Sequence, residues 1–147
     1  MRPRIVVLVG LPGSGKSTYL ERLGVTALAS DAVRGLLADD QTEQSIHIEV
    51  FATLRYLLRR RLALERPVTY VDATHLTPRE RRPYVKTGQI YRCSVEAVFF
   101  DIPIEVCRER NCRRERVVPA DVLERMAAKL VPPTIEEGFS AITVVRE

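Results

Sequence analysis

The sequence predicts an α/β fold in which helices cover both faces of a five-stranded parallel sheet. Two observations indicate this fold. Short apolar runs alternate along the chain with segments of helical periodicity, a pattern typical of parallel strands joined by crossover helices. The first apolar run is followed at once by a glycine-rich loop and a helical segment. Strand, glycine loop and helix in this order are the context in which phosphate-binding loops occur.

Length and composition limit the class of protein. The chain has 147 residues, so we expect a single domain over residues 1–147 with a real hydrophobic core. Its longest apolar run is too short for a membrane span, and the basic N-terminus leads into the first strand rather than a cleavage site. We therefore expect a cytoplasmic protein. The three cysteines and two histidines lack zinc-site spacing, which favours reduced thiols.

The first half of the chain predicts two strands and two helices. The first strand covers residues 4–9, and its apolar, mostly β-branched sequence is typical of a strand buried on both faces. A helix follows from Ser17 to Leu23, and a second strand covers residues 25–29. A long helix covers residues 44–64 and ends before Pro67. Apolar residues recur in it at helical spacing at Ile46, Val50, Leu54, Leu57, Leu58 and Leu62.

The second half continues the alternation. A third strand covers residues 68–72, and the next helix begins with Thr77 as its cap and Pro78 at its first position. A fourth strand covers residues 95–100, and Pro103 opens an arginine-rich helix. Another helix begins around residues 119–121, and residues 143–145 form the last strand. Ligands of such a sheet are expected at the carboxyl ends of its strands.

The glycine loop carries the most specific chemistry. Gly10-Leu11-Pro12-Gly13-Ser14-Gly15-Lys16-Ser17 fits the P-loop pattern G-x-x-x-x-G-K-[ST]. Glycines let the backbone N–H groups turn toward phosphate oxygens, and the following helix N-terminus adds partial positive charge. Lys16 is expected to reach the β- and γ-phosphates, and Ser17 to hold Mg²⁺. We therefore expect ATP or another nucleoside triphosphate, bound by Gly10, Pro12, Gly13, Ser14, Gly15, Lys16, Ser17 and Thr18. The alternative is an ordinary glycine turn.

Acidic residues follow two of the predicted strands. Asp31 and Arg34 come just after the second strand, at a spacing that puts them on one helical face. A kinase needs a carboxylate to deprotonate the attacking hydroxyl and a cation to hold the acceptor. A helix cap and a surface arginine would explain the same pair. Asp72 ends the third strand and is a candidate to hold Mg²⁺ or to cap the next turn.

Positive charge is concentrated between the fourth strand and Pro119. The net charge is +4 and most cations are arginines, which suit bidentate phosphate contacts, although a solvated surface has the same composition. An arginine from a mobile lid can neutralise a migrating phosphoryl group, whereas arginines among glutamates also form salt-bridged surface helices. The cluster consists of Arg108, Arg110, Arg113, Arg114 and Arg116. His75 is expected to stabilise a turn by a hydrogen bond rather than to act in catalysis, and His47 to lie on an exposed helix face.

Together these segments resemble the kinase domain of the bacteriophage polynucleotide 5′-kinase family. The resemblance extends over nearly the whole chain. Besides the P-loop, it rests on Ser30-Asp31-Ala32-Val33-Arg34, Val71-Asp72-Ala73-Thr74-His75-Leu76 and Asp101-Ile102-Pro103. Its most specific part is Arg110-Asn111-Cys112-Arg113-Arg114 followed by Val118-Pro119-Ala120-Asp121-Val122-Leu123, which is similar to that family's lid and the helix after it.

The resemblance implies a P-loop kinase fold with an arginine-rich lid around residues 108–118 and transfer of the ATP γ-phosphate to a 5′-hydroxyl of DNA or RNA. It implies that Asp31 is the general base and that Arg34 binds the phosphate next to the reacting nucleoside. Arg110 and either Arg113 or Arg114 would be the lid arginines. The phosphatase motif Asp-x-Asp-Gly-Thr of the phage enzyme is not in this sequence, so 3′-end repair is not implied.

Two other functions are compatible with the motifs. A P-loop kinase acting on a nucleoside, sugar or antibiotic shares the loop and the Asp72 segment. An ATP-gated nucleic-acid-binding module shares the loop and the basic charge, although the Asp31–Arg34 pair argues against it, since a binding module needs no hydroxyl-activating carboxylate.

Overall fold

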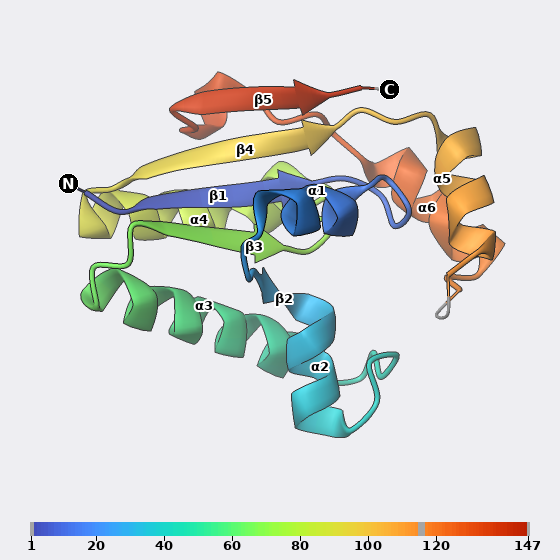
Figure 1. Cartoon of the computed structure of the whole chain (residues 1–147), viewed down its shortest axis with the longest axis horizontal. Coiled ribbons are helices and arrows are strands. Elements are labelled where there is room, and N and C mark those ends of the chain that lie inside the picture. Colours follow the sequence, from blue (N-terminus) through green and yellow to red (C-terminus); the bar gives the residue numbers. More distant parts are fainter. Residues whose placement is uncertain (1, 115–116, 147) are drawn as a thin grey trace.

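A computed structural model of the chain describes residues 2–114 and 117–146, in which a five-stranded parallel sheet lies between two layers of helices (Figure 1). The strands are β1 (Arg4–Val9), β2 (Leu28–Ala29), β3 (Val68–Asp72), β4 (Ser94–Phe100) and β5 (Ala141–Val145). Their order across the sheet is β2-β3-β1-β4-β5, and each neighbouring pair is parallel. The predicted fold class is therefore confirmed, with the most apolar strand at the centre.

The helices fall on both sides of this sheet. They are α1 (Lys16–Leu23), α2 (Ser30–Ala38), α3 (His47–Ala63), α4 (Pro78–Tyr91), α5 (Ile104–Cys112) and α6 (Ala120–Lys129), and a 3₁₀ turn, η1 (Ile135–Glu137), precedes β5. None of the helices in the described ranges is both long and apolar enough to cross a membrane. The α4 start agrees with the prediction, because the Thr77 side chain accepts a hydrogen bond from the Glu80 N–H and Pro78 occupies the first turn.

Alternate residues of β1 face two separate hydrophobic layers. Ile5, Val7 and Val9 pack with residues of α3 and α4, including Leu58 and Tyr84. Val6 and Leu8 pack on the opposite face, where the helical partners come from α1, α5 and α6. All five of these β1 residues are buried, as expected of a strand whose sequence is apolar from residue 5 to residue 9.

In the first half of the chain, two elements start three residues later than the sequence predicts. The second strand has only two residues because Gly24 ends α1 in the left-handed region (φ 69°) and Val25 still donates to the Leu20 carbonyl. The long helix starts at His47 rather than at residue 44, since local side-chain bonds hold the preceding turn. Asp40 accepts from the Thr42 N–H and hydroxyl, and Glu43 accepts from both groups of Ser45.

The parallel arrangement brings the loops that follow the strands to one edge of the sheet. In Figure 1 the strand arrows point toward the end of the molecule where α5 and α6 lie. The P-loop follows β1, Asp31 follows β2, and Asp72 is the last residue of β3. The predicted site residues therefore share the carboxyl edge of the sheet.

Candidate active site

The P-loop curls tightly between β1 and α1. Gly13 and Gly15 have φ angles of 82° and 102°, in the left-handed region that glycine adopts at little cost. The Lys16 ammonium donates to the carbonyl oxygens of Gly10 (2.8 Å) and Leu11 (3.0 Å), so the lysine lies folded along its own loop. The Ser14 hydroxyl is buried and has no hydrogen-bond partner among the described residues. This enclosed hydroxyl and ammonium suit an anion, which can accept from both.

The charges around Lys16 are closely coupled. Burial lowers the Lys16 pKa to about 8, against the attraction of Asp72, and the nearby Arg114 lowers it further. Burial raises the pKa of Asp72, while Lys16 opposes that shift. β3 is the neighbour of β1, and the Gly10 N–H donates to the Thr74 carbonyl (3.1 Å), which joins the Asp72 segment to the start of the loop. The prediction that Asp72 belongs to the phosphate site stays a prediction, but its charge acts on the site lysine.

Asp31 and Arg34 lie in the first turns of α2. Asp31 does not cap this helix, because the N-cap is Ala29. Arg34 is not a surface arginine, because it is buried. The Arg34 guanidinium contacts the Asp31 carboxylate at 3.4 Å, and the Asp31 side chain is 43% exposed. Nε of Arg34 is buried and has no hydrogen-bond partner in the described part of the chain. A buried cation with an unused donor beside an accessible carboxylate is an arrangement suited to binding a further anion.

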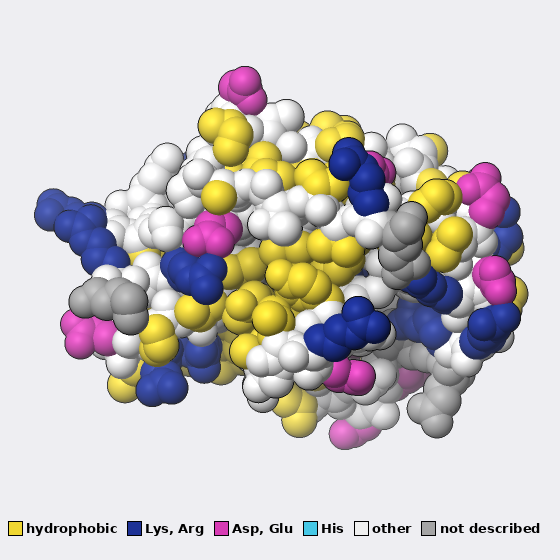
Figure 2. Space-filling model, turned by 45° about the horizontal axis from the view of Figure 1, so that its top comes forward, with side chains coloured by type: hydrophobic (Ala, Val, Ile, Leu, Met, Phe, Trp, Pro, Cys, Tyr) yellow, Lys and Arg dark blue, Asp and Glu magenta, His cyan; other side chains and the backbone are white. Residues whose placement is uncertain are grey.

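Helix α5 lies directly on the P-loop. A β-carbon on Gly13 would lie 2.6 Å from the Cys107 carbonyl oxygen, and Arg110 Nη1 approaches the Gly13 carbonyl at 3.5 Å. Figure 2 shows basic side chains gathered at the end of the molecule where α5 and α6 lie, with acidic ones between them. Arg108 pairs with Glu124, which agrees with the surface interpretation for that arginine. Arg116, which we include in the cluster, lies outside the described residues.

The two remaining lid arginines differ in environment. Arg113 is 76% exposed and pairs with Glu109 across one helical turn (2.7 Å). Arg114 is half-buried and lies close enough to lower the pKa of both Lys16 and Asp72, each of which is shifted mainly by its own burial. The structure therefore places Arg110 and Arg114 near the P-loop and turns Arg113 outward.

Asn111 has a structural role in the arginine-rich segment that the sequence analysis did not identify. Its buried amide donates to the Val118 carbonyl (2.6 Å) and accepts from the Val118 N–H (3.0 Å). These two bonds hold together the ends of the segment that carries Arg113 and Arg114. Nothing in the composition signals this role, because an asparagine in an arginine-rich helix is also a common surface residue.

His75 lies in a turn below the P-loop, as predicted. Its Nδ1 lies 2.6 Å from the Leu8 carbonyl oxygen, and because a carbonyl only accepts, this nitrogen carries the proton. Burial lowers the His75 pKa to about 4, so the ring is neutral. The ring also packs edge-on against Tyr84. These contacts hold the turn against the end of β1, while His47 is exposed at the start of α3.

A strand, a P-loop with an enclosed lysine and a helix that covers the loop define a nucleotide-binding domain with a P-loop kinase fold. The chain belongs to the AAA domain family, whose sequence profile matches residues 5–133.

Known proteins with similar sequence or structure include polynucleotide-processing enzymes. The chain is 25% identical over 148 aligned positions to a bifunctional polynucleotide phosphatase/kinase of Schizosaccharomyces pombe, covering 96% of this chain and 33% of the relative. A chain in the structure of the Pnkp1/Rnl/Hen1 RNA repair complex superposes with a TM-score of 0.75 at 23% identity, covering 88% of this chain and 44% of that one. A putative kinase of Chloroflexus aurantiacus J-10-fl has a TM-score of 0.76 at 15% identity, with coverages of 99% and 89%. This chain therefore corresponds to about a third of the fission-yeast relative.

Proposed function

We propose that this protein is a polynucleotide 5′-hydroxyl kinase that transfers the γ-phosphate of ATP to the 5′-hydroxyl of DNA or RNA. The observation that carries the proposal is the Asp31–Arg34 pair beside the P-loop. An accessible carboxylate next to a buried arginine with an unused donor can take a proton from a hydroxyl and bind a phosphate at the same time. The 5′-end of a polynucleotide presents those two groups together.

The P-loop residues hold the phosphates of ATP. Ser14 and Lys16 lie enclosed in the loop, and the first turn of α1 presents backbone N–H groups and the exposed side chains of Ser17 and Thr18. Lys16 exchanges its bonds with the Gly10 and Leu11 carbonyls for bonds to phosphate oxygens.

Oxygen donors suited to Mg²⁺ are present at the same edge. The Asp72 carboxylate is charge-coupled to Lys16, and the Ser17 hydroxyl follows Lys16 directly, a hard-ligand pair of the kind Mg²⁺ uses with substrate phosphates. Ser17 and Asp72 would hold the ion, which when bound supplies charge neutralisation at the β- and γ-phosphates.

In the transfer step the acceptor's 5′-oxygen forms a bond to the γ-phosphorus, and the bond from that phosphorus to the β–γ bridging oxygen breaks. The hydroxyl proton passes to the Asp31 carboxylate, and ADP leaves with the bond electrons. Arg34 holds the phosphate on the 3′ side of the reacting nucleoside. Arg110 and Arg114 stabilise the charge that spreads over the γ-phosphate oxygens.

One relative and one structural neighbour support a polynucleotide as the acceptor. The fission-yeast relative is a polynucleotide phosphatase/kinase by name, and a chain of an RNA repair complex shares the fold. The proposal covers only the kinase reaction, because this chain spans a third of that relative and lacks the Asp-x-Asp-Gly-Thr motif.

The proposal is tested by label transfer from γ-labelled ATP, in the presence of Mg²⁺, to a short oligonucleotide with a free 5′-hydroxyl. The oligonucleotide is used both as DNA and as RNA. We expect labelled product from the natural protein and a loss of at least about 100-fold in rate for Asp31→Asn. Asp121→Asn is the matched control, since Asp121 is the first-turn aspartate of α6. Absence of label from every oligonucleotide, with nucleotide binding intact, would refute the proposal and direct the search to small-molecule acceptors.

A further inference from the structure

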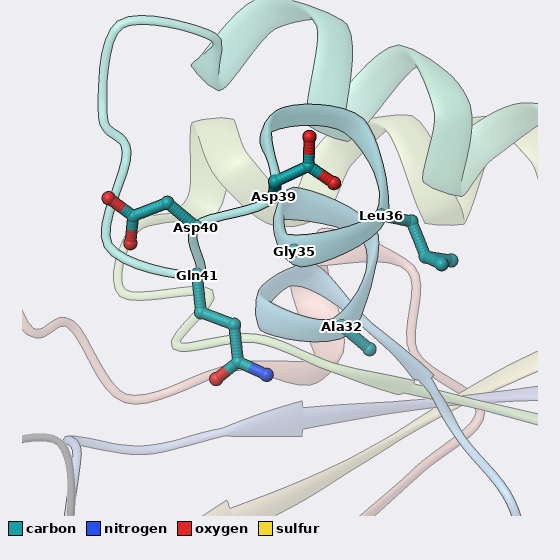
Figure 3. Close-up of a pocket in the computed structure, with 6 residues that line it drawn as sticks. All are labelled: Ala32, Gly35, Leu36, Asp39, Asp40 and Gln41. Atoms are coloured by element: carbon teal, nitrogen blue, oxygen red, sulfur yellow. The ribbon is translucent and has the colours of Figure 1, made fainter.

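An open recess of about 510 Å³ lies along one side of α2. Figure 3 shows Gly35 near its middle, with the labelled side chains around it. The lining residues are Ala32, Gly35, Leu36, Asp39, Asp40 and Gln41. The motifs identified in the sequence leave this surface unexplained.

The position of the recess relative to Asp31 follows from the helix geometry. At about 100° per residue, the mean direction of Ala32, Gly35, Leu36 and Asp39 is roughly a quarter-turn from Asp31. Arg34 lies about a quarter-turn or less on the other side of Asp31. The Asp31 carboxylate is therefore flanked by the recess on one side and by the buried Arg34 guanidinium on the other. A nucleoside whose 5′-oxygen lies at Asp31 can extend its base toward the recess and its 3′-phosphate toward Arg34.

The recess has an apolar floor and a polar rim. Ala32 and Gly35 leave the surface flat because their side chains are small or absent. Leu36 is 83% exposed, which is a large fraction for a leucine. The Gln41 side chain packs across Gly35, where a β-carbon would come within 3.1 Å of its Cγ. A larger residue at position 35 would require the Gln41 side chain to shift by a few tenths of an ångström. A flat apolar floor with an amide at its edge suits an aromatic ring bearing polar groups.

The charges on the rim exclude a phosphate. Asp39 and Asp40 both contribute to the lining, and one Asp40 oxygen accepts hydrogen bonds from Thr42. Carboxylates repel phosphate but accept hydrogen bonds from the exocyclic amino groups of adenine, cytosine and guanine. The Gln41 amide can both donate and accept at such a base edge.

We propose that this recess binds the base of the acceptor's 5′-terminal nucleoside and favours bases with an exocyclic amino group over uracil or thymine. The proposal rests on the proposed kinase function and adds a base-specific subsite to it. Leu36 packs against the base, Gln41 and the two aspartates contact its polar edge, and Arg34 holds the 3′-phosphate.

The KM for oligonucleotides that differ only in the 5′-terminal base tests this subsite. We expect KM to be about threefold to tenfold lower with an amino-bearing base than with uracil or thymine, the value of one hydrogen bond. Leu36→Ser is expected to raise KM for all acceptors by about fivefold or more, since it removes apolar contact area. Gln41→Leu is expected to reduce the difference between bases. KM for ATP stays unchanged in both variants.

Leu37→Ser provides the matched control, because Leu37 is a neighbouring exposed leucine of α2 (49%) that does not line the recess. Label transfer with the same KM for all four bases, unchanged in Leu36→Ser and Gln41→Leu, would overturn the subsite and leave the kinase intact. A lack of transfer to any 5′-hydroxyl oligonucleotide would overturn both.

Discussion

The Cys107 carbonyl oxygen occupies the space into which a side chain on Gly13 would project. A β-carbon on Gly13 would lie 2.6 Å from this oxygen, and Gly13 has a φ of 82°. The glycine therefore serves two purposes, since it allows the loop to turn and allows α5 to lie on it. The second purpose brings Arg110 against the loop, where its Nη1 approaches the Gly13 carbonyl (3.5 Å).

Gly13→Ala is expected to separate α5 from the P-loop. The added methyl group cannot avoid a backbone oxygen, so the loop and α5 must move apart and nucleotide affinity should fall by about 10- to 100-fold, the value of one hydrogen bond to a charged group. Titration with ADP and a urea unfolding curve measure the two effects. Gly24→Ala is the matched control, because Gly24 also has a positive φ (69°) but no atom within 4 Å of a β-carbon. It should lose about 1 kcal/mol of stability and no affinity, so equal affinity loss in both variants would contradict the packing role.

Nucleotide affinity is expected to decrease as the pH rises above about 8. Burial lowers the Lys16 pKa to about 8 in the free protein, against the attraction of Asp72 and Asp31. Bound phosphates favour the charged lysine, so above pH 8 binding must take up a proton and the affinity falls by up to about tenfold per pH unit. Calorimetric titration with ADP between pH 7 and 9.5 measures this change.

Lys16→Arg is the control for this pH dependence, because arginine stays charged over the whole range. Its affinity is expected to be lower, but nearly constant with pH. A natural protein whose affinity did not change between pH 7 and 9.5 would show that Lys16 does not titrate there.

Local patterns in the sequence predicted the framework of the site, and long-range packing decided its details. The P-loop and the Thr77 cap depend on neighbours within a few residues, so their spacing was sufficient. The Arg81–Glu137 pair joins residues 56 positions apart, with two bonds of 2.9 Å around a fully buried guanidinium. Neither residue lies in a motif, and in a sequence both look like surface charges.

Long-range packing also decided the environment of Asp31 and Arg34. The i, i+3 spacing of Asp31 and Arg34 placed both on one helical face, but whether that face is buried depends on how α2 packs on α3. Val33 of α2 packs against Val50 and Leu54 of α3, and Arg34 beside it is buried. Arginines are rarely buried, so composition alone predicts the opposite. In the sequence, Arg34 could be identified as a candidate site residue only by its spacing from Asp31, not by its residue type.

Arg114 is expected to matter for the transfer rate and Arg113 is not. Arg114 lies near enough to influence Lys16 and Asp72, whereas Arg113 is paired with Glu109 in solvent. Arg114→Ala should therefore slow transfer by about 10³-fold or more, in the range known for catalytic arginines. Arg113→Ala should change the rate by no more than about threefold, since an exposed pair contributes little.

Single-turnover label transfer at saturating ATP measures these two rates, with Arg114→Lys as a test of whether charge alone is sufficient. A larger loss for Arg113→Ala than for Arg114→Ala would mean that the lid takes another orientation when the substrates are bound.

Protein stability is expected to fall as the pH decreases from about 6.5 toward 4 because of His75. Burial lowers its pKa to about 4 in the folded chain, and the charges of Lys16 and Arg81 contribute, whereas the bond to Leu8 opposes the shift. The unfolded chain therefore binds a proton in this window that the folded chain does not, at a cost of up to about 1.4 kcal/mol per pH unit.

His75→Asn should lose this pH dependence of stability. The asparagine amide can still donate to the Leu8 carbonyl, does not titrate, and tolerates the positive φ of 49°. Urea unfolding at pH 7.5, 6 and 5 compares the slopes, with His47→Asn, a change at an exposed histidine, as the control expected to behave like the natural protein. Equal slopes in His75→Asn and the natural protein would show that the acid sensitivity arises elsewhere.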